Sequence, residues 1–275
     1  MAEMSYPKRI YLELTNECNL ACPFCLKSQR SLCSLDLVTV EKVMRESRGF
    51  CDYFYFHVQG EPLLYPKLPE ALALAEKYQI NIQLVTNGTL LAEKQEMLLQ
   101  AKALRKVAVS LPGLFLVSDL AEKLKILEQF IDAATKKDLY VELRVWAAKD
   151  RRIIDYLEKT FGKTVVGNEN MKIREKLYLS FKRAYNWPNL NALIERHQHY
   201  CIAPRLMICI LSDGTITPCC LDVNGQINLG NIKELTLKEA WASARNQSII
   251  RGFQDNKVIE LLCKHCDYGV SYEDD

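Results

Sequence analysis

The stretch RIYLELTNECNLACPFC, residues 9–25, joins an apolar run to three closely spaced cysteines. Residues 9–15 have the apolar pattern of a buried strand. Cys18, Cys22 and Cys25 then follow at spacings of four and three. Three thiolates can surround one metal cluster and leave one coordination position free, whereas a structural zinc site takes four protein ligands. The spacing therefore favours an iron–sulfur cluster, although Cys33 could close a zinc site instead.

The composition is that of an ordinary globular protein. The 275 residues are 49% hydrophobic and 25% charged, with a formal net charge of +2. This balance does not indicate nucleic acid as the main partner. We find no signal peptide and no apolar run of transmembrane length, so we expect a cytoplasmic protein without a membrane partner. Because the cytosol keeps thiols reduced, eleven cysteines indicate metal or redox chemistry rather than disulfides.

Strand-like and helix-like patterns alternate along the first half of the chain. The expected strands cover residues 9–15, 53–58, 80–86, 106–111 and 140–146. Such alternation predicts an α/β fold with a parallel sheet, either curled or open. One more helix and strand are possible within residues 151–166. We therefore expect a core over residues 1–165, a linker or substrate-proximal segment over 166–200, and a second unit over 201–275.

Several polar motifs follow the expected strands at their carboxyl ends. They are the cysteine loop, the GEP of residues 60–62, the TNG of residues 86–88, and Ser110. Ligands of parallel α/β proteins bind at this edge of the sheet. We therefore expect all four motifs to line one ligand-binding opening, which we call the mouth. His57 lies just before the GEP loop and is a candidate substrate contact or a core histidine.

The pattern of Cys18, Cys22, Phe24 and Cys25 resembles the signature of the radical S-adenosylmethionine (SAM) superfamily. The resemblance implies a partial (β/α)6 TIM-like barrel. It also implies that the three cysteines hold a 4Fe–4S cluster whose free iron binds the methionine moiety of SAM. Phe24 would then pack near the adenine.

Further cofactor contacts are implied by the same resemblance. The GEP loop is similar to the superfamily's GGE-type loop, with Gln59 in place of the first glycine, and its backbone would bind the methionine amino group. Arg144 could bind the SAM carboxylate through its guanidinium fork, or it could be a surface arginine. The implied cofactor-binding residues are Phe24, Gly60, Glu61, Pro62, Asn87, Ser110 and Arg144.

A second cysteine set lies in the last 75 residues of the chain. Four thiols suit either zinc or a fully ligated 4Fe–4S cluster. Their arrangement resembles the SPASM and twitch groups of radical SAM enzymes, and the absence of a cysteine after Cys266 resembles the shorter twitch form. A twitch-type unit is a β-hairpin plus helix with one auxiliary cluster. The expected ligands are Cys201, Cys219, Cys263 and Cys266, with Cys220 as an alternative to Cys219.

The resemblance implies that the reduced cluster cleaves SAM to a 5'-deoxyadenosyl radical, which abstracts a substrate hydrogen. A fully ligated auxiliary cluster is suited to accept the electron left on the substrate. We therefore predict an oxidoreductase similar to the 2-deoxy-scyllo-inosamine dehydrogenase family, with a flavodoxin or ferredoxin as electron donor. Arg183, Tyr185 and Trp187 are candidate substrate contacts.

Two other functions compete with this prediction. One is modification of a peptide or protein, as in sulfatase maturation or thioether formation. Only eight residues of this sequence precede the first expected strand, too few for a peptide-recognition domain, which favours a small-molecule substrate. The other is a zinc-stabilised binding module without catalysis. The sequence does not identify the substrate or the oligomeric state.

Overall fold

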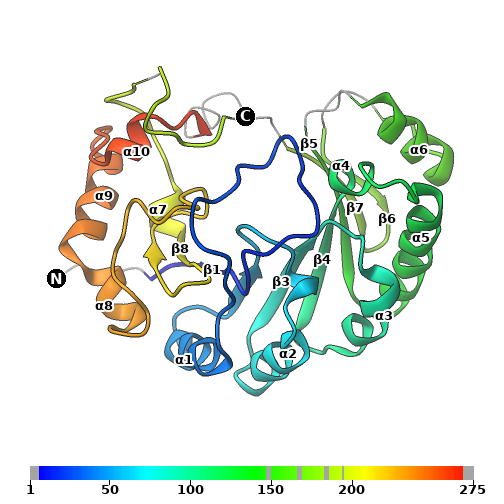
Figure 1. Cartoon of the computed structure of the whole chain (residues 1–275), viewed down its shortest axis with the longest axis horizontal. Helices are drawn as coiled ribbons and strands as arrows, with labels where there is room; N and C mark the ends of the chain where they lie inside the picture. Colours follow the sequence, from blue (N-terminus) through cyan, green and yellow to red (C-terminus); the bar gives the residue numbers. More distant parts are fainter. Residues whose placement is uncertain (1–5, 147–149, 166–168, 183–185, 194, 269–275) are drawn as a thin grey trace.

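One nine-stranded sheet organises the molecule in the computed structural model, which describes residues 6–146, 150–165, 169–182, 186–193 and 195–268. The spatial order is β6-β7-β5-β4-β3-β2-β1-β8-β9, and the sheet curves around the cysteine loop (Figure 1). The strands are β1 (Arg9–Leu12), β2 (Tyr53–Phe56), β3 (Asn81–Thr86), β4 (Leu104–Ser110), β5 (Tyr140–Trp146), β6 (Met171–Arg174), β7 (Leu177–Lys182), β8 (Met207–Ile210) and β9 (Ile216–Thr217).

Neighbouring strands from β1 to β5 pair in parallel, as the alternating pattern predicts. Helices connect these strands and lie on the outer face of the curved sheet (Figure 1). The helical elements are α1 (Leu37–Ser47), η1 (Pro62–Leu64), α2 (Leu68–Lys77), α3 (Leu91–Gln100), α4 (Leu111–Leu114), α5 (Leu120–Lys136), α6 (Arg151–Phe161), α7 (Ala203–Leu206), α8 (Leu237–Ala242), α9 (Ala244–Gln254) and α10 (Leu261–Lys264).

The two faces of the sheet differ because side chains alternate along each strand. In β2, Phe54 and Phe56 are fully buried in the core formed with the outer helices. Tyr53 and Tyr55 point to the opposite, concave face and are only half-buried. The carboxyl ends of β1 to β5 therefore surround a concave face that carries polar and aromatic side chains.

Residues 171–182 are part of the sheet rather than of an irregular linker. The sequence predicts a linker over 166–200, yet β6 and β7 form an antiparallel hairpin in this region. β7 also pairs in parallel with β5 and is the sixth parallel strand, which the sequence placed near residues 165–166. The strand was expected directly after the helix of residues 151–161, whereas the chain first forms β6 and the alternating residues of β7 come later.

The C-terminal hairpin also joins the sheet. β8 pairs in parallel with β1, and β9 pairs with β8 in the antiparallel sense. The backbone of Glu13 continues the contact, since its N–H donates to the carbonyl of Ile210 at 2.9 Å. The two cysteine-bearing regions are therefore attached to adjacent strands of one sheet.

Among the described residues, none of the helices has both the length and the apolar character needed to span a bilayer.

Candidate functional site

The three cysteines of the first motif lie in the loop that follows β1. Cys18 and Cys25 are exposed, Cys22 is partly buried, and all three are free thiols. Burial, together with the neighbouring Cys25 and Cys18, raises the pKa of the Cys22 thiol to about 11. The loop therefore brings the three thiols into one electrostatic neighbourhood, as the motif predicts.

Gly60 allows the GEP loop to approach the cysteine loop closely. Its φ is +73°, and a Cβ at this position would lie 2.3 Å from the carbonyl oxygen of Thr15 and 2.8 Å from that of Glu17. The next residue closes the contact, since the Glu61 N–H donates to the Glu17 carbonyl at 2.7 Å. A glycine is thus required here by both conformation and space.

The Glu61 side chain points into the protein and joins the GEP loop to the end of β3. Its carboxylate accepts hydrogen bonds from the Thr86 hydroxyl at 2.7 Å, the Asn87 N–H at 2.7 Å and the Leu63 N–H at 3.0 Å. Burial raises the pKa of this carboxyl to about 7. The backbone of Glu61 also has partners within the protein, since its N–H donates to Glu17 and its carbonyl oxygen accepts from the Leu64 N–H at 2.9 Å, so this residue fixes the shape of the loop.

Asn87 connects the end of β3 to the cysteine loop. Its Nδ2 donates to the Asn19 side chain at 2.8 Å and lies 3.8 Å from the Cys18 sulfur. Its Oδ1 accepts from the hydroxyl of Thr89 at 2.6 Å, and Asn19 in turn donates to the same hydroxyl at 2.8 Å. The network of Asn19, Asn87 and Thr89 holds the cysteine loop against the TNG turn.

Ser110 and Arg144 lie side by side at the ends of β4 and β5, where they are register partners. The Arg144 side chain is mostly buried and donates from Nε to the Glu142 carboxylate at 3.1 Å, so it is not a surface arginine. Lys106 binds the other side of the same carboxylate at 2.6 Å. Burial raises the pKa of Glu142, but Arg144 and Lys106 outweigh it and lower the pKa to about 2. Glu142 is therefore ionised between two cations.

Aromatic side chains continue this concave face toward β1. Tyr11 stacks on Tyr55 with ring centroids 4.7 Å apart, and His57 lies 6.2 Å from Tyr11. Burial and the Arg144 guanidinium lower the pKa of His57 to about 3. His57 is therefore a neutral imidazole on the concave face, as its predicted position at the mouth requires.

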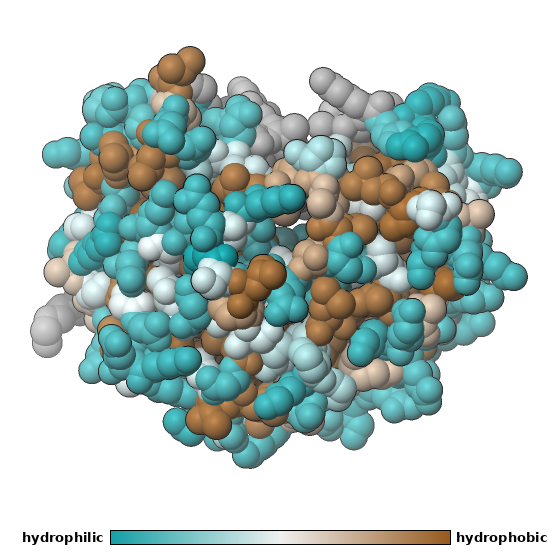
Figure 2. Space-filling view, in the orientation of Figure 1, coloured by the Kyte–Doolittle hydropathy of each residue, from teal (hydrophilic) through white to brown (hydrophobic). Residues whose placement is uncertain are grey.

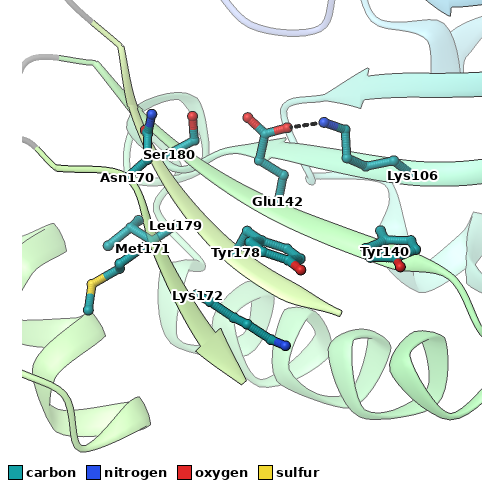
Figure 3. A pocket seen from close by; sticks show the side chains of 9 residues that line it. All are labelled: Lys106, Tyr140, Glu142, Asn170, Met171, Lys172, Tyr178, Leu179 and Ser180. Atoms are coloured by element: carbon teal, nitrogen blue, oxygen red, sulfur yellow. Dashed lines mark ion pairs between the residues drawn. The ribbon is translucent and has the colours of Figure 1, made fainter. Parts of the chain in front are cut away.

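A cavity of about 520 Å³ lies beside Glu142, between residues of β5 and β7 (Figure 3). Tyr140 and Tyr178 stack along its wall with centroids 6.1 Å apart. Glu142 and Lys106 form another part of the wall. The cavity lies at the amino-terminal half of β5 and β7, and neither the cysteines nor the GEP loop line it. It is therefore separate from the mouth, although Glu142 connects the two through Arg144.

The second cysteine set also converges. Burial and the neighbouring Cys219 and Cys266 raise the pKa of Cys201 to about 12. The pKa of Cys263 is raised well above its usual range by burial and by Cys219, Cys201 and Cys266. These four thiols thus share one neighbourhood beside α10.

The Cys219 and Cys220 thiols hydrogen-bond to each other, yet their other neighbours differ. Cys220 packs against the group that contains Tyr11, Tyr55 and Trp187, on the concave side of the sheet. The charge of Cys220 raises the pKa of Tyr11, whereas the charge of Cys219 raises the pKa values of Cys201 and Cys263. Cys219 acts directly on two of the other three thiols, so it stays the predicted ligand, with Cys220 in contact with it as the alternative.

Trp187 contacts both the cysteine loop and the group of side chains that contains Cys220. Its indole N–H donates to the Phe24 carbonyl at 3.1 Å, and its ring packs beside Cys220. Phe24 itself is 41% exposed. The other two candidate substrate contacts, Arg183 and Tyr185, lie outside the described residues.

Sequence reasoning missed a buried ion pair beneath the mouth. Glu13 follows β1, Arg30 lies in the cysteine loop, and their side chains meet at 2.5 Å. Their side chains are 0% and 9% exposed, respectively. A glutamate inside an apolar run was the one available signal, because a buried charge requires a partner.

The donor sets fit the groups that the motifs imply. Thiolates are the ligands that iron–sulfur clusters prefer, and all eleven cysteines are free. Among the described residues, no group of three or more Cys, His, Asp or Glu side chains has the close spacing of a site for a single metal ion, so the thiols of each set are neighbours that do not form such a site. Figure 2 shows the face with the cysteine loop as largely hydrophilic, with hydrophobic patches over α4 and α10. Exposed Leu116 and Leu261 lie in these regions.

Two family models match the chain. Residues 12–134 match the radical SAM superfamily, and residues 201–267 match SPASM, an iron–sulfur cluster-binding domain. These segments contain the three-cysteine loop and the four converging thiols, respectively. The chain therefore belongs to the radical SAM superfamily and carries a C-terminal SPASM region.

Particular relatives cover the chain to different extents. It is 22% identical over 272 residues to the S-adenosyl-L-methionine-dependent 2-deoxy-scyllo-inosamine dehydrogenase of Niallia circulans, covering 94% of this chain and 92% of that protein. It is 29% identical over 109 residues to PqqA peptide cyclase of Gluconobacter oxydans, covering 38% of this chain and only 30% of that protein.

A solved structure shares the fold along nearly the whole chain. The structure of BtrN in complex with AdoMet and 2-DOIA has a TM-score of 0.64 at 17% identity, covering 96% of this chain and 94% of that one. The open sheet described above is thus the partial TIM-like barrel of this superfamily. The chain is a radical SAM iron–sulfur enzyme, whose cofactors are SAM, a 4Fe–4S cluster and auxiliary iron–sulfur in the SPASM region.

Proposed function

We propose that this enzyme is an oxidoreductase that removes a hydrogen atom and then an electron from a small-molecule substrate. Cys18, Cys22 and Cys25 hold the SAM-binding cluster, and Cys201, Cys219, Cys263 and Cys266 hold one auxiliary 4Fe–4S cluster. When bound, SAM and its reduced cluster supply the 5'-deoxyadenosyl radical that abstracts the hydrogen. The substrate then loses one electron and one proton to become a carbonyl or an unsaturated product.

The observation that carries this proposal is the convergence of four thiols at the second site. A cluster with four protein ligands has no open iron for a substrate, so its suitable role is electron acceptance. β1 and β8 are hydrogen-bonded neighbours, so the two cysteine sites are attached to one rigid part of the sheet. Full-length similarity to a SAM-dependent dehydrogenase supports the same class of reaction.

The residues of the mouth have separate roles in this proposal. Phe24 packs near the adenine, and the loop of Gly60, Glu61 and Pro62 receives the methionine amino group. Arg144 and Ser110 are adjacent and suit the SAM carboxylate, with Asn87 positioning the cysteine loop. His57 and Trp187 lie on the side where a substrate enters between the two sites.

The alternative substrate is a peptide or protein. The partial similarity to PqqA peptide cyclase supports this class. The similarity to a SAM-dependent dehydrogenase over 94% of this chain favours the first proposal. A flavodoxin or ferredoxin is the proposed electron donor, and the abundance of free thiols supports a cytoplasmic location.

Metal analysis of a variant tests the proposal directly. We would replace Cys18, Cys22 and Cys25 together by alanine and measure iron, sulfide and zinc after anaerobic purification. About four irons and four sulfides should remain per chain at the second site. About one zinc without iron would contradict the oxidative proposal and indicate redox-neutral chemistry. Cys51→Ala is the control, because this buried cysteine belongs to neither set.

A further inference from the structure

The carboxylate of Glu13 binds three separate segments of the molecule. Its Oε1 accepts a hydrogen bond from the Gln59 N–H at 3.2 Å, just before Gly60 in the cofactor loop. Its Oε2 accepts from the Ser212 N–H at 2.8 Å, in the turn after β8. The same oxygen accepts from Arg30 Nη2 at 2.5 Å, in the cysteine loop. One fully buried carboxylate thus joins the parts that carry the SAM site to the part that leads to Cys219.

Arg30 makes the matching contacts from the cysteine loop. Its Nε donates to the Val223 carbonyl at 2.8 Å, and its Nη1 donates to the Ser212 hydroxyl at 3.2 Å. Nη1 also lies 3.5 Å from the Asp213 carboxylate. These acceptors lie on both sides of Cys219 in the sequence. A planar guanidinium with fixed donors can hold several such acceptors in one arrangement, which a lysine cannot do.

Neighbouring residues repeat the connection. The Asn224 side-chain oxygen receives hydrogen bonds from the Ser28 hydroxyl at 3.2 Å and from the Gln29 N–H at 2.8 Å. Residues 28–30 are therefore tied to residues 212–224 through both charged and neutral hydrogen bonds. Since burying two charges is costly, such a pair is better explained by geometric specificity than by stability alone.

We propose that Glu13 and Arg30 are positioning residues that set the separation between the two cysteine sites. The inference rests on the proposed assignment of a cluster to each site. Electron transfer between clusters depends steeply on their separation. We call the Glu13–Arg30 pair with its hydrogen bonds the clasp. It connects the loop of Cys18, Cys22 and Cys25 to the hairpin that precedes Cys219. It would hold the separation constant while substrate and SAM enter and leave.

The test compares clasp variants of the anaerobically purified, cluster-loaded enzyme. The variants are Arg30→Met, Glu13→Gln, their combination, and Arg30→Lys, which keeps the charge but loses the fork. Glu41→Gln is the control, because Glu41 forms an exposed ion pair with Lys77 at 2.7 Å between α1 and α2. Hydrogen exchange would be measured in residues 26–33 and 212–224, and pulsed electron paramagnetic resonance would measure the magnetic interaction between the two reduced clusters.

We expect amide exchange in both segments to rise together by about tenfold or more in Arg30→Met and Glu13→Gln. Arg30→Met leaves the buried Glu13 carboxylate without a cation, and Glu13→Gln leaves Arg30 with Asp213 alone at 3.5 Å. In the double variant, the increase in amide exchange should not exceed the sum of the increases in the two single variants, since the two residues act as a pair. The interaction between the clusters should weaken or become heterogeneous, with Arg30→Lys intermediate and Glu41→Gln unchanged.

The proposal is overturned if only residues 26–33 loosen, or if both segments loosen while the interaction between the clusters stays the same. A fault in the proposed function would appear differently. If the unmodified enzyme lacks a second cluster, the oxidative proposal fails, while the exchange rates still decide whether the clasp joins the two segments.

Discussion

The two cysteine sites are attached to adjacent strands of one sheet, yet they differ in their access to solvent. Cys18 and Cys25 of the first site are exposed, whereas all four thiols of the second site are only partly accessible. The first site has three thiols and an adjoining loop shaped by Gly60, so it leaves room for a ligand. The second has four thiols and suits a closed cluster. This difference in access is what the proposed function requires, with SAM bound at the first site and an electron accepted at the second.

The sharpest test of this comparison concerns the neighbouring residues Cys219 and Cys220. Cys219→Ala should remove the auxiliary cluster, about four irons per chain, because one of four ligands is lost. Cys220→Ala should keep all of the iron, since Cys220 faces Tyr11 and Trp187 instead. Iron and sulfide analysis of both variants measures the difference. Equal losses would show that the two thiols share the cluster.

Gly60→Ala should damage the open site through backbone collision. A Cβ placed 2.3 Å from the Thr15 carbonyl must displace backbone, so we expect a loss of about 3 kcal/mol or more in the free energy of unfolding. SAM binding should weaken as well. Gly49→Ala is the matched control, because its φ is +86° and nothing lies within 4 Å of the added carbon. It should cost only about 1 kcal/mol. Chemical denaturation and equilibrium binding of SAM measure both effects.

Glu142→Gln tests the electrostatics of the concave face. The folded-state pKa of about 2 lies below the ordinary value of 4.5, so the ionised carboxylate stabilises the fold above pH 4.5. This stabilisation is lost as the pH falls from 4.5 toward 2. At pH 7 the variant should be less stable by roughly 2 kcal/mol. The difference from the unmodified protein should shrink on acidification, and a constant difference would refute the assignment.

Trp187→Phe should have the smallest effect. The substitution keeps an aromatic ring beside Cys220 and removes the hydrogen bond to the Phe24 carbonyl. One lost hydrogen bond at a partly exposed site costs about 1 kcal/mol or less. SAM affinity, measured by titration, should fall by less than about tenfold. A complete loss of SAM cleavage would give Trp187 a direct role that this geometry does not indicate.

Much of the architecture follows from local patterns. Residues 53–58 alternate two phenylalanines with tyrosine and histidine, which predicts a strand with one core face and one polar face, as observed in β2. The sixth parallel strand was harder to locate. β7 alternates core and concave residues as β2 does, but it lies beyond the place expected for it directly after α6, and it pairs in parallel with β5 although α6 and β6 separate the two in the sequence.

The spacing of the cysteines along the sequence predicted the chemistry of the protein. Cysteine spacing reports a metal site because ligands within one loop are close in space wherever the loop lies. The spacing of Cys18, Cys22 and Cys25 thus indicated the cluster and its free coordination position, and the last six cysteines indicated a second centre.

Long-range pairing depended on the folded chain. Glu13 and Arg30 are 17 positions apart, and Ser212 is 199 positions from Glu13. They meet because β8 returns to pair with β1, and no local pattern encodes such a contact. The same pairing brings Cys219 near Cys201 and Cys263, while Cys220 packs against the group of Tyr11, a difference between adjacent residues that the sequence left open. Backbone direction at the end of a hydrogen-bonded hairpin decides which of two neighbouring side chains faces the cluster.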